Sequence, residues 1–179
     1  AIRSRGLGDV YKRQIISTVA VSLRDQQEQN VIFDQQSKII DAARLLEVYP
    51  SSQEALASIE EVVVNLNDGE PSSFPPEQYD LDSILRDSSQ HTVLNGSEDI
   101  AMISVRENLS KVYIEYRNNE LKTLILPVRG YGLWGTLYGY LALDSDLNTI
   151  VGLEFYKHKE TPGLGLSLIH ISEPTRPNC

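Results

Sequence analysis

The chain has 179 residues, of which 25 are acidic and 16 are basic, so its formal net charge at pH 7 is −9. This acidity argues against a nucleic-acid partner, because phosphate binding requires a basic surface. The one cysteine, Cys179, is the last residue, which excludes an internal disulfide framework and a multi-thiolate metal site.

Neither end of the chain continues the pattern of the sequence beside it. Residues 1–14, AIRSRGLGDVYKRQ, and residues 166–179, LSLIHISEPTRPNC, read like translated adaptor or vector sequence. We therefore expect a non-native leader and a non-native tail, and leave both out of the fold prediction. Residues 15–165 hold 11 basic and 23 acidic residues, a net charge of −12, and are enough for one domain with an appendage.

The credible chain opens with an apolar stretch at residues 15–23, IISTVAVSL. Such a stretch is too short to cross a bilayer, which takes about twenty residues. On these residues alone two interpretations stand side by side: a buried helical turn, or the surviving end of a membrane helix.

Residues 24–110 are expected to form helices and loops. Apolar residues recur at spacings of three and four between residues 24 and 47, which predicts an amphipathic helix. A second helix is predicted from an N-cap at Ser51 or Ser52 as far as Leu66, burying Leu56, Ile59, Val63 and Leu66. We interpret the apolar stripe of each helix as part of the core of the domain, in preference to a surface that binds a partner.

The rest of this region alternates loops with little regular structure. Residues 67–80 hold three prolines and a glycine and are typical of a loop. One helical turn is predicted over residues 81–86, and residues 88–98 are expected to be irregular. His91 lies in that irregular segment and is assigned no role.

Strand patterns begin near Lys111 and continue to Lys157. Apolar and polar residues alternate up to Tyr116, Asn118-Asn119 predicts a tight turn, and residues 121–128 return as the partner strand. Two further strands are predicted at residues 138–143 and 149–157, joined by a turn. An antiparallel sheet of about four strands with flanking helices follows, which is the α+β class.

Two glycine-rich segments adjoin these strands. GYGLWG, residues 130–135, contains the only tryptophan, Trp134, and ETPGLG, residues 160–165, contains Gly163 and Gly165, which allow close approach of a ligand to the backbone. Neither segment fits a Walker loop or a dinucleotide fingerprint. An aromatic shelf with backbone donors fits a flat heteroaromatic ring. The alternative is that Trp134 packs in the core under the sheet.

His158 and Glu160 are the ionisable residues beside the second segment. Two residues apart on a strand end they would point the same way, as an acid–base pair requires. We prefer the simpler interpretation, in which Glu160 caps the loop and His158 faces solvent. Thr161 is interpreted as a hydrogen-bond anchor rather than a nucleophile.

The same segments carry a resemblance to a known family. Residues 130–146, GYGLWGTLYGYLALDSD, and residues 158–165, HKETPGLG, resemble the FMN-binding domain found in the C subunit of sodium-translocating NADH:quinone reductases. The G subunit of Rnf electron-transport complexes is a more distant relative with a similar turn. The resemblance extends more loosely back to Ile15. It implies that residues 111–165 are the first half of an FMN-binding domain and that residues 15–23 end an N-terminal transmembrane helix.

The resemblance also implies a cofactor and its site. FMN would be held by Trp134, Glu160, Thr161, Gly163 and Leu164, with neither a catalytic side chain nor a metal site. In the family the flavin is joined through its phosphate to the threonine of a Ser-Gly-Ala-Thr-type motif. That motif does not occur in this sequence, so covalent flavin attachment to this chain itself is not expected.

The function implied is that of an FMN-bearing electron-transfer subunit of a sodium-translocating NADH:quinone reductase. The parent protein would be a single-pass protein of the bacterial inner membrane with its soluble domain in the periplasm. Its partners would be the other subunits and the membrane, with no nucleic acid, and the fragment alone is expected to be inactive. Two alternatives remain: an Rnf-type electron-transport subunit, and a membrane-tethered, non-redox sensor or scaffold domain.

Overall fold

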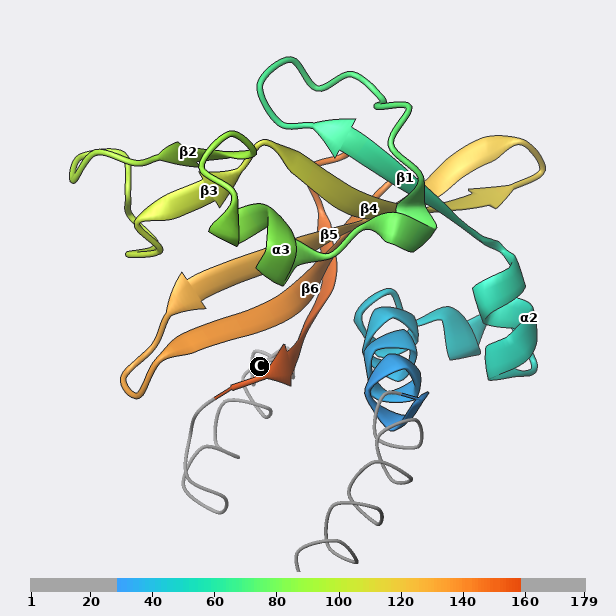
Figure 1. The fold of residues 1–179 in the computed structure, drawn as a ribbon. Coiled ribbons are helices and arrows are strands. Elements are labelled where there is room, and N and C mark those ends of the chain that lie inside the picture. The colour runs from blue at the N-terminus through green and yellow to red at the C-terminus, as the bar shows by residue number, and fades with distance from the viewer. Residues whose placement is uncertain (1–28, 159–179) are drawn as a thin grey trace, which may run out of the picture. The chain divides into compact units, whose positions relative to one another are not determined.

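The structure is a computed structural model that describes residues 29–158 (Figure 1). The chain divides into two compact units, residues 1–36 and residues 37–179. Of the first unit, residues 29–36 are described, and they are helical. The architecture below is that of the second unit as far as His158.

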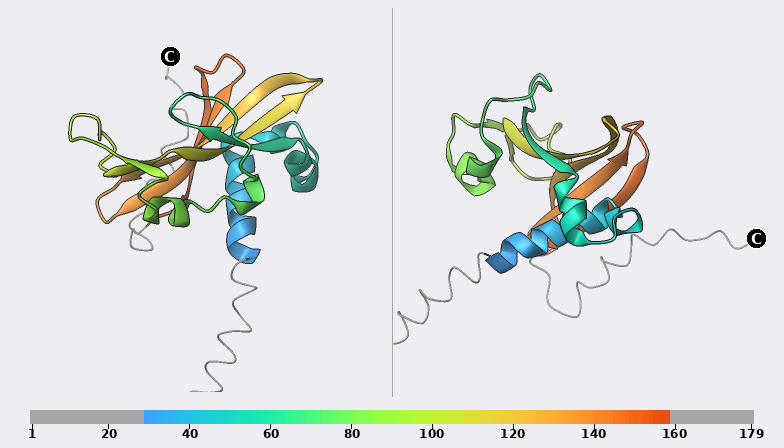
Figure 2. Two further views of the ribbon diagram at one scale, coloured as in Figure 1. Left: turned by 45° about the horizontal axis from the view of Figure 1, so that its top comes forward. Right: turned by 90° about the vertical axis from the view of Figure 1, so that its right-hand side faces the viewer.

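A five-stranded antiparallel sheet forms the centre of this unit (Figure 1). Its strands follow in the order β1 (Ile59–Asn65), β4 (Leu109–Arg117), β5 (Glu120–Tyr131), β6 (Thr136–Asp144) and β7 (Ile150–Lys157). The sheet is strongly twisted (Figure 2), as right-handed strand twist requires. The helices and this antiparallel sheet confirm the predicted α+β class.

The remaining elements are short. A helix ends at residue 42, and it is followed by η1 (Leu45–Glu47), α2 (Ser52–Ala57), η2 (Pro76–Gln78) and α3 (Leu81–Arg86). A second, two-stranded sheet pairs β2 (His91–Val93) with β3 (Val105–Glu107). The helical turn predicted at residues 81–86 is confirmed, with Asp80 accepting hydrogen bonds from the N–H groups of Asp82 and Ser83.

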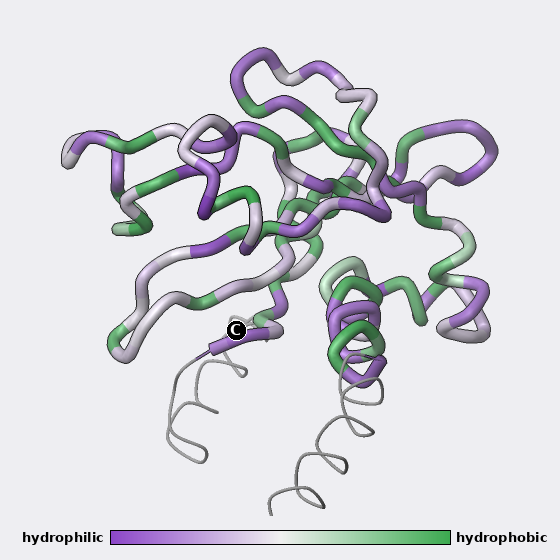
Figure 3. The backbone as a smooth tube through the Cα atoms, viewed as in Figure 1, coloured by the Kyte–Doolittle hydropathy of each residue, from purple (hydrophilic) through white to green (hydrophobic). Residues whose placement is uncertain are grey.

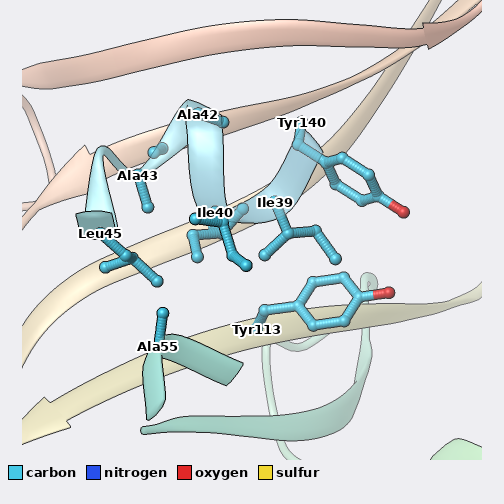
Figure 4. Packing of buried hydrophobic residues seen from close by; sticks show 10 residues of the cluster. Ile39, Ile40, Ala42, Ala43, Leu45, Ala55, Tyr113 and Tyr140 are labelled. Atoms are coloured by element: carbon cyan, nitrogen blue, oxygen red, sulfur yellow. The ribbon is translucent and has the colours of Figure 1, made fainter. Parts of the chain in front are cut away.

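The core lies between the end of the first helix and one face of the sheet. Ile39, Ile40 and Ala42 of the helix contribute to one buried cluster with residues of β4, β5 and β6. Figure 4 shows the isoleucine side chains pointing toward Tyr113, with Tyr140 beside Ile39. The hydropathy colouring alternates along the helix (Figure 3), which agrees with the predicted amphipathic pattern.

Gly152 sets how closely β7 approaches that helix. A Cβ atom at this position would overlap the backbone carbonyl oxygen of Ala42. The absence of a side chain therefore allows the helix end to lie directly against the strand. An ion pair between Lys38 and Glu154, 3.3 Å long, joins the same two elements.

The predicted helix from Ser51 to Leu66 is wrong beyond its first turns. Ser51 does cap α2, since its hydroxyl accepts from the N–H of Glu54, but the helix ends at Ala57 and β1 follows at once. β1 contains three consecutive valines, whose branched side chains favour the extended backbone. The main sheet therefore has five strands instead of about four.

Three other boundaries differ from the predictions. The helix predicted to reach residue 47 ends at residue 42, and Arg44 adopts a left-handed conformation before η1. The segment predicted to be irregular contains β2. β5, predicted to end at residue 128, continues to Tyr131, so the first two residues of the glycine-rich segment, Gly130 and Tyr131, belong to the strand. The later strands, β6 and β7, match the prediction closely.

Candidate functional site

The β5–β6 hairpin holds the glycine-rich segment with the tryptophan. Tyr131 pairs with Thr136, and the N–H of Gly132 donates to the carbonyl oxygen of Gly135 over 2.8 Å. Gly135 has φ 148°, which favours glycine. These two glycines close a tight connection and leave Leu133 and Trp134 at its tip.

Trp134 is therefore a surface residue. Its exposed fraction is 64%, and that of Leu133 is 82%. The alternative in which Trp134 packs under the sheet is excluded by this exposure. An exposed indole at a hairpin tip is a flat apolar face, and its contact with a heteroaromatic ring stays a prediction.

The other predicted site residues are Glu160, Thr161, Gly163 and Leu164, and all four lie outside the described residues. The structure nevertheless shows where the chain leaves the sheet toward them. β7 runs antiparallel to β6, and its last residue, Lys157, lies opposite Tyr138. Tyr138 is four residues from Trp134, at most about 14 Å of chain. His158, which is exposed, thus follows β7 at the end of the sheet that carries the tryptophan.

A row of tyrosines crosses the sheet beside this end. The rings of Tyr140 and Tyr156 stack with centroids 4.8 Å apart, and Tyr113 meets Tyr140 edge-on at 5.6 Å. Tyr138 lies 6.2 Å from Tyr156, and the Lys157 ammonium is 5.1 Å from the Tyr138 ring centroid. Tyr138 and Tyr140 alternate within the predicted strand 138–143 and so share a face of it, but no local pattern indicates that β4 and β7 would add to the row.

Burial makes these phenols weaker acids. It raises the pKa of Tyr113, of Tyr140 and of Tyr156, in each case as the largest effect. Burial, followed by the Glu107 carboxylate, raises the pKa of Tyr79 to about 12. A phenol is already neutral at physiological pH with an ordinary pKa of about 10, and the contacts that the row makes are ring contacts.

The buried carboxylates belong to ion pairs within the fold. Glu107 of β3 meets Arg129 of β5 at 2.7 Å, and Glu115 of β4 meets Arg117 at 2.6 Å. Neither carboxylate lies on the hairpin tip. Within residues 29–158, moreover, no group of three or more His, Cys, Asp and Glu residues is arranged to hold a metal ion.

Sequence reasoning missed a second segment beside the tip. The N–H of Tyr131 donates to the carbonyl oxygen of Ala101 over 2.8 Å, so residues 99–104 run alongside the end of β5. Ile100 and Met102 on this segment are 90% and 62% exposed. The exposed apolar residues were the available signal, but only the pairing with β5 brings them to the hairpin.

None of the helices in residues 29–158 combines the length and the apolar character needed to span a membrane. The apolar stretch at residues 15–23, predicted as the end of a membrane helix, lies outside the described residues.

Comparisons with known proteins place these features in a family. The FMN-binding domain model matches residues 132–175, a range that begins at the hairpin tip. The C subunit of the Na(+)-translocating NADH-quinone reductase of Pseudomonas aeruginosa is 44% identical over 155 residues, covering 84% of this chain and 59% of the relative. The same subunit of Vibrio vulnificus is 38% identical over 152 residues, covering 84% and 60%.

A solved structure agrees with the sequence comparisons. The crystal structure of NqrC from Shewanella oneidensis superposes with a TM-score of 0.63 at 29% identity, covering 72% of this chain and 60% of that one. The chain thus spans about three fifths of the length of the relatives it matches. It belongs to the family of the C subunits of the Na(+)-translocating NADH-quinone reductases.

Proposed function

We propose that the chain is part of an FMN-bearing electron-transfer subunit of a sodium-translocating NADH:quinone reductase. The observation that carries this proposal is the FMN-binding domain match, which begins at the hairpin tip where Trp134 is exposed. The names of the relatives favour this function over an Rnf-type subunit. The flavin-domain match disfavours a non-redox sensor or scaffold.

Among the described residues, the exposed side chain of Trp134 fits a flavin ring. An isoalloxazine ring has large apolar faces, and the exposed indole of Trp134 supplies a flat surface of that kind. Glu160, Thr161, Gly163 and Leu164 would complete the pocket with backbone donors and an apolar contact. When bound, FMN supplies the electron-transfer chemistry, and the residues of the chain hold and orient it.

The test uses the complete protein from the uninterrupted gene, produced in cells that attach flavin. A yellow protein whose denatured band fluoresces would support the proposal, and a colourless protein without a fluorescent band would overturn it. Trp134→Ala is expected to increase the emission of bound flavin in the native protein, because a stacked indole quenches flavin fluorescence. Leu147→Ala, an exposed apolar residue in the β6–β7 turn, is the matched control.

We further propose a single-pass inner-membrane protein whose soluble domain lies in the periplasm, assembled with the other reductase subunits. The apolar residues 15–23 support a membrane helix upstream of this domain. A phosphatase fused to the carboxyl end of the complete protein should be active if the domain is periplasmic. A phosphatase fusion that is inactive, with a cytoplasmic fluorescent fusion that glows, would contradict this topology.

A further inference from the structure

We propose that Ile100, Met102, Tyr131 and Leu133 form a docking surface for another protein subunit, one that presents an apolar pocket with a basic rim. The inference rests on the proposed function, since the partner would be a subunit of the same reductase. The surface lies beside Trp134, so a docked partner would be next to the proposed flavin shelf.

The four residues come from two segments that are held together. Tyr131 and Ala101 share the backbone hydrogen bond described above, and a Cβ atom built on Gly130 would be 3.8 Å from the Cβ of Ala101. Next along β5, the Arg129 guanidinium donates to the carbonyl oxygen of Val105 over 2.6 Å. The position of one segment therefore fixes that of the other.

All four of these apolar residues are more than half exposed. Ile100 is 90% exposed, Leu133 82%, Met102 62% and Tyr131 54%. Single exposed apolar residues are common on soluble proteins, but neighbouring ones on linked segments mark interaction sites. Aromatic residues and methionine are also enriched at protein interfaces.

The backbone around Met102 is held in a conformation that costs free energy. Met102 has φ 51° and Ser104 has φ 64°, values that residues other than glycine seldom adopt. The Asp99 carboxylate stabilises this arrangement by accepting from the N–H groups of Ile103 and Ser104, each over 2.8 Å. Strain of this kind is typical of functional segments, and Met102, where it occurs, is 62% exposed.

Charge favours a protein over a lipid surface as the occupant. Glu98 and Asp99 adjoin Ile100 in the sequence. The charge of Arg129 is paired with that of Glu107, and Arg106, which donates to the neutral amide of Asn67, leaves the two carboxylates in excess. Loops that insert into anionic membranes are flanked by basic residues. An acidic border instead complements a protein partner with lysine or arginine around its pocket.

Site-specific photocrosslinking in the complete protein, assembled with its reductase subunits in native membranes, tests the proposal. A benzophenone side chain at position 100 or 133 should crosslink to one identified subunit, whereas one at Leu147 or Ile150 should not. These controls are 54% and 62% exposed and lie in or beside the β6–β7 turn. Crosslinks to lipid, crosslinks within the same polypeptide, or no crosslinks at positions 100 and 133 would each overturn the proposal.

A variant with two charges provides an independent measurement. Ile100→Asp combined with Leu133→Asp should reduce NADH-dependent quinone reduction by the assembled complex at least about tenfold, as expected for central interface residues. Its flavin fluorescence and thermal unfolding should match those of the wild type. Unchanged activity would contradict docking, while absence of flavin from the wild-type protein would contradict the proposed function instead.

Discussion

At the scale of single residues, Glu115 shows how a charge is accommodated inside this fold. Its side chain has no exposed surface, and it accepts hydrogen bonds from Tyr49, Arg117 and Thr123 over 2.9, 2.6 and 2.8 Å. Burial pushes its pKa upward, but these hydrogen bonds outweigh that effect and the pKa is lowered. The carboxylate thus connects the segment after η1 to β4 and β5.

Glu115→Gln is expected to lower the free energy of unfolding by about 2 kcal/mol, because the hydrogen bonds to Glu115 lose a charged acceptor. Denaturant unfolding of the full chain at pH 7 measures this change. Glu120→Gln removes an exposed carboxylate that pairs with Lys122, and it should leave the stability unchanged. Equal effects at the two positions would contradict the role assigned to burial.

The same residue predicts a pH dependence. Because the pKa of Glu115 is lower in the folded state, its contribution is present above the unfolded pKa of about 4.3 and is lost as the pH falls through the folded value. The stability difference between wild type and Glu115→Gln should therefore shrink below about pH 4. Denaturation midpoints measured from pH 7 to pH 3 would show it, and a constant difference would refute it.

Gly152→Ala is expected to destabilise the chain by roughly 1–3 kcal/mol, since overpacking forces neighbouring backbone to move. The added Cβ atom would meet the carbonyl oxygen of Ala42, which is backbone and cannot rotate away. Gly96→Ala is the control, because nothing lies within 4 Å of a Cβ atom at that position. Thermal unfolding of both variants decides whether the helix–β7 contact is as close as described.

At the scale of elements, the sequence predicts the hairpins well and the segment after α2 poorly. Turn residues such as Asn118-Asn119 act locally, so a short window contains the information that fixes β4 and β5. The spacing of Leu56, Ile59 and Val63 also fits a helix. The segment forms a strand instead, because the branched valines favour extended backbone and because it pairs with β4. The pairing partners are about fifty positions away in the sequence, so a short window does not contain them.

In the candidate site, too, one part can be predicted from local sequence and another cannot. Trp134 and its flanking glycines follow from local sequence, because a glycine-rich connection between two strand patterns places its middle residues in solvent. The position of residues 99–104 does not follow from local sequence. It depends on the hydrogen bond between Tyr131 and Ala101 and on the hydrogen bond that the Asp99 carboxylate accepts from Ile103. A contact between segments thirty residues apart leaves no periodic pattern to read.

Asn119→Gly should stabilise the β4–β5 hairpin by about 0.5–1 kcal/mol. Asn118 and Asn119 have φ values of 55° and 62°, the left-handed pair that a type I′ turn requires, and asparagine followed by glycine is its preferred sequence. Asn148→Gly, at a turn position without a positive φ, should give no such gain. A lower midpoint for Asn119→Gly in urea would show that the turn is of another type.

At the scale of the whole described unit, one ion pair joins the two sheets. Arg129 of β5 and Glu107 of β3 are about one tenth exposed and 2.7 Å apart, and Arg129 also holds the carbonyl oxygen of Val105. Desolvation offsets much of the attraction in such a pair, but removing one partner leaves a buried charge alone. The small sheet therefore depends on β5 for its position.

Arg129→Ala is expected to cost about 3–5 kcal/mol of unfolding free energy, with faster amide hydrogen exchange in β2 and β3. Replacing both partners, Arg129→Met with Glu107→Leu, should recover most of the loss because no charge is left unpaired. Lys122→Ala, from the exposed pair with Glu120, is the control. A double variant as unstable as Arg129→Ala would contradict this explanation.

The exposed hairpin tip also determines which spectroscopic signals report on which part of the chain. Trp134 and Met102 are the only tryptophan and the only methionine among the 179 residues, and both lie outside the core, whose buried aromatic residues are Tyr113 and Tyr140. Indole emission will therefore shift little when the core melts, whereas the near-ultraviolet circular dichroism of the tyrosines will collapse. Conversely, a methyl-labelled methionine gives one nuclear resonance. A partner that covers the tip will move that resonance and the signal of the exposed Tyr131, while the signals of the core residues Tyr113 and Tyr140 stay unchanged.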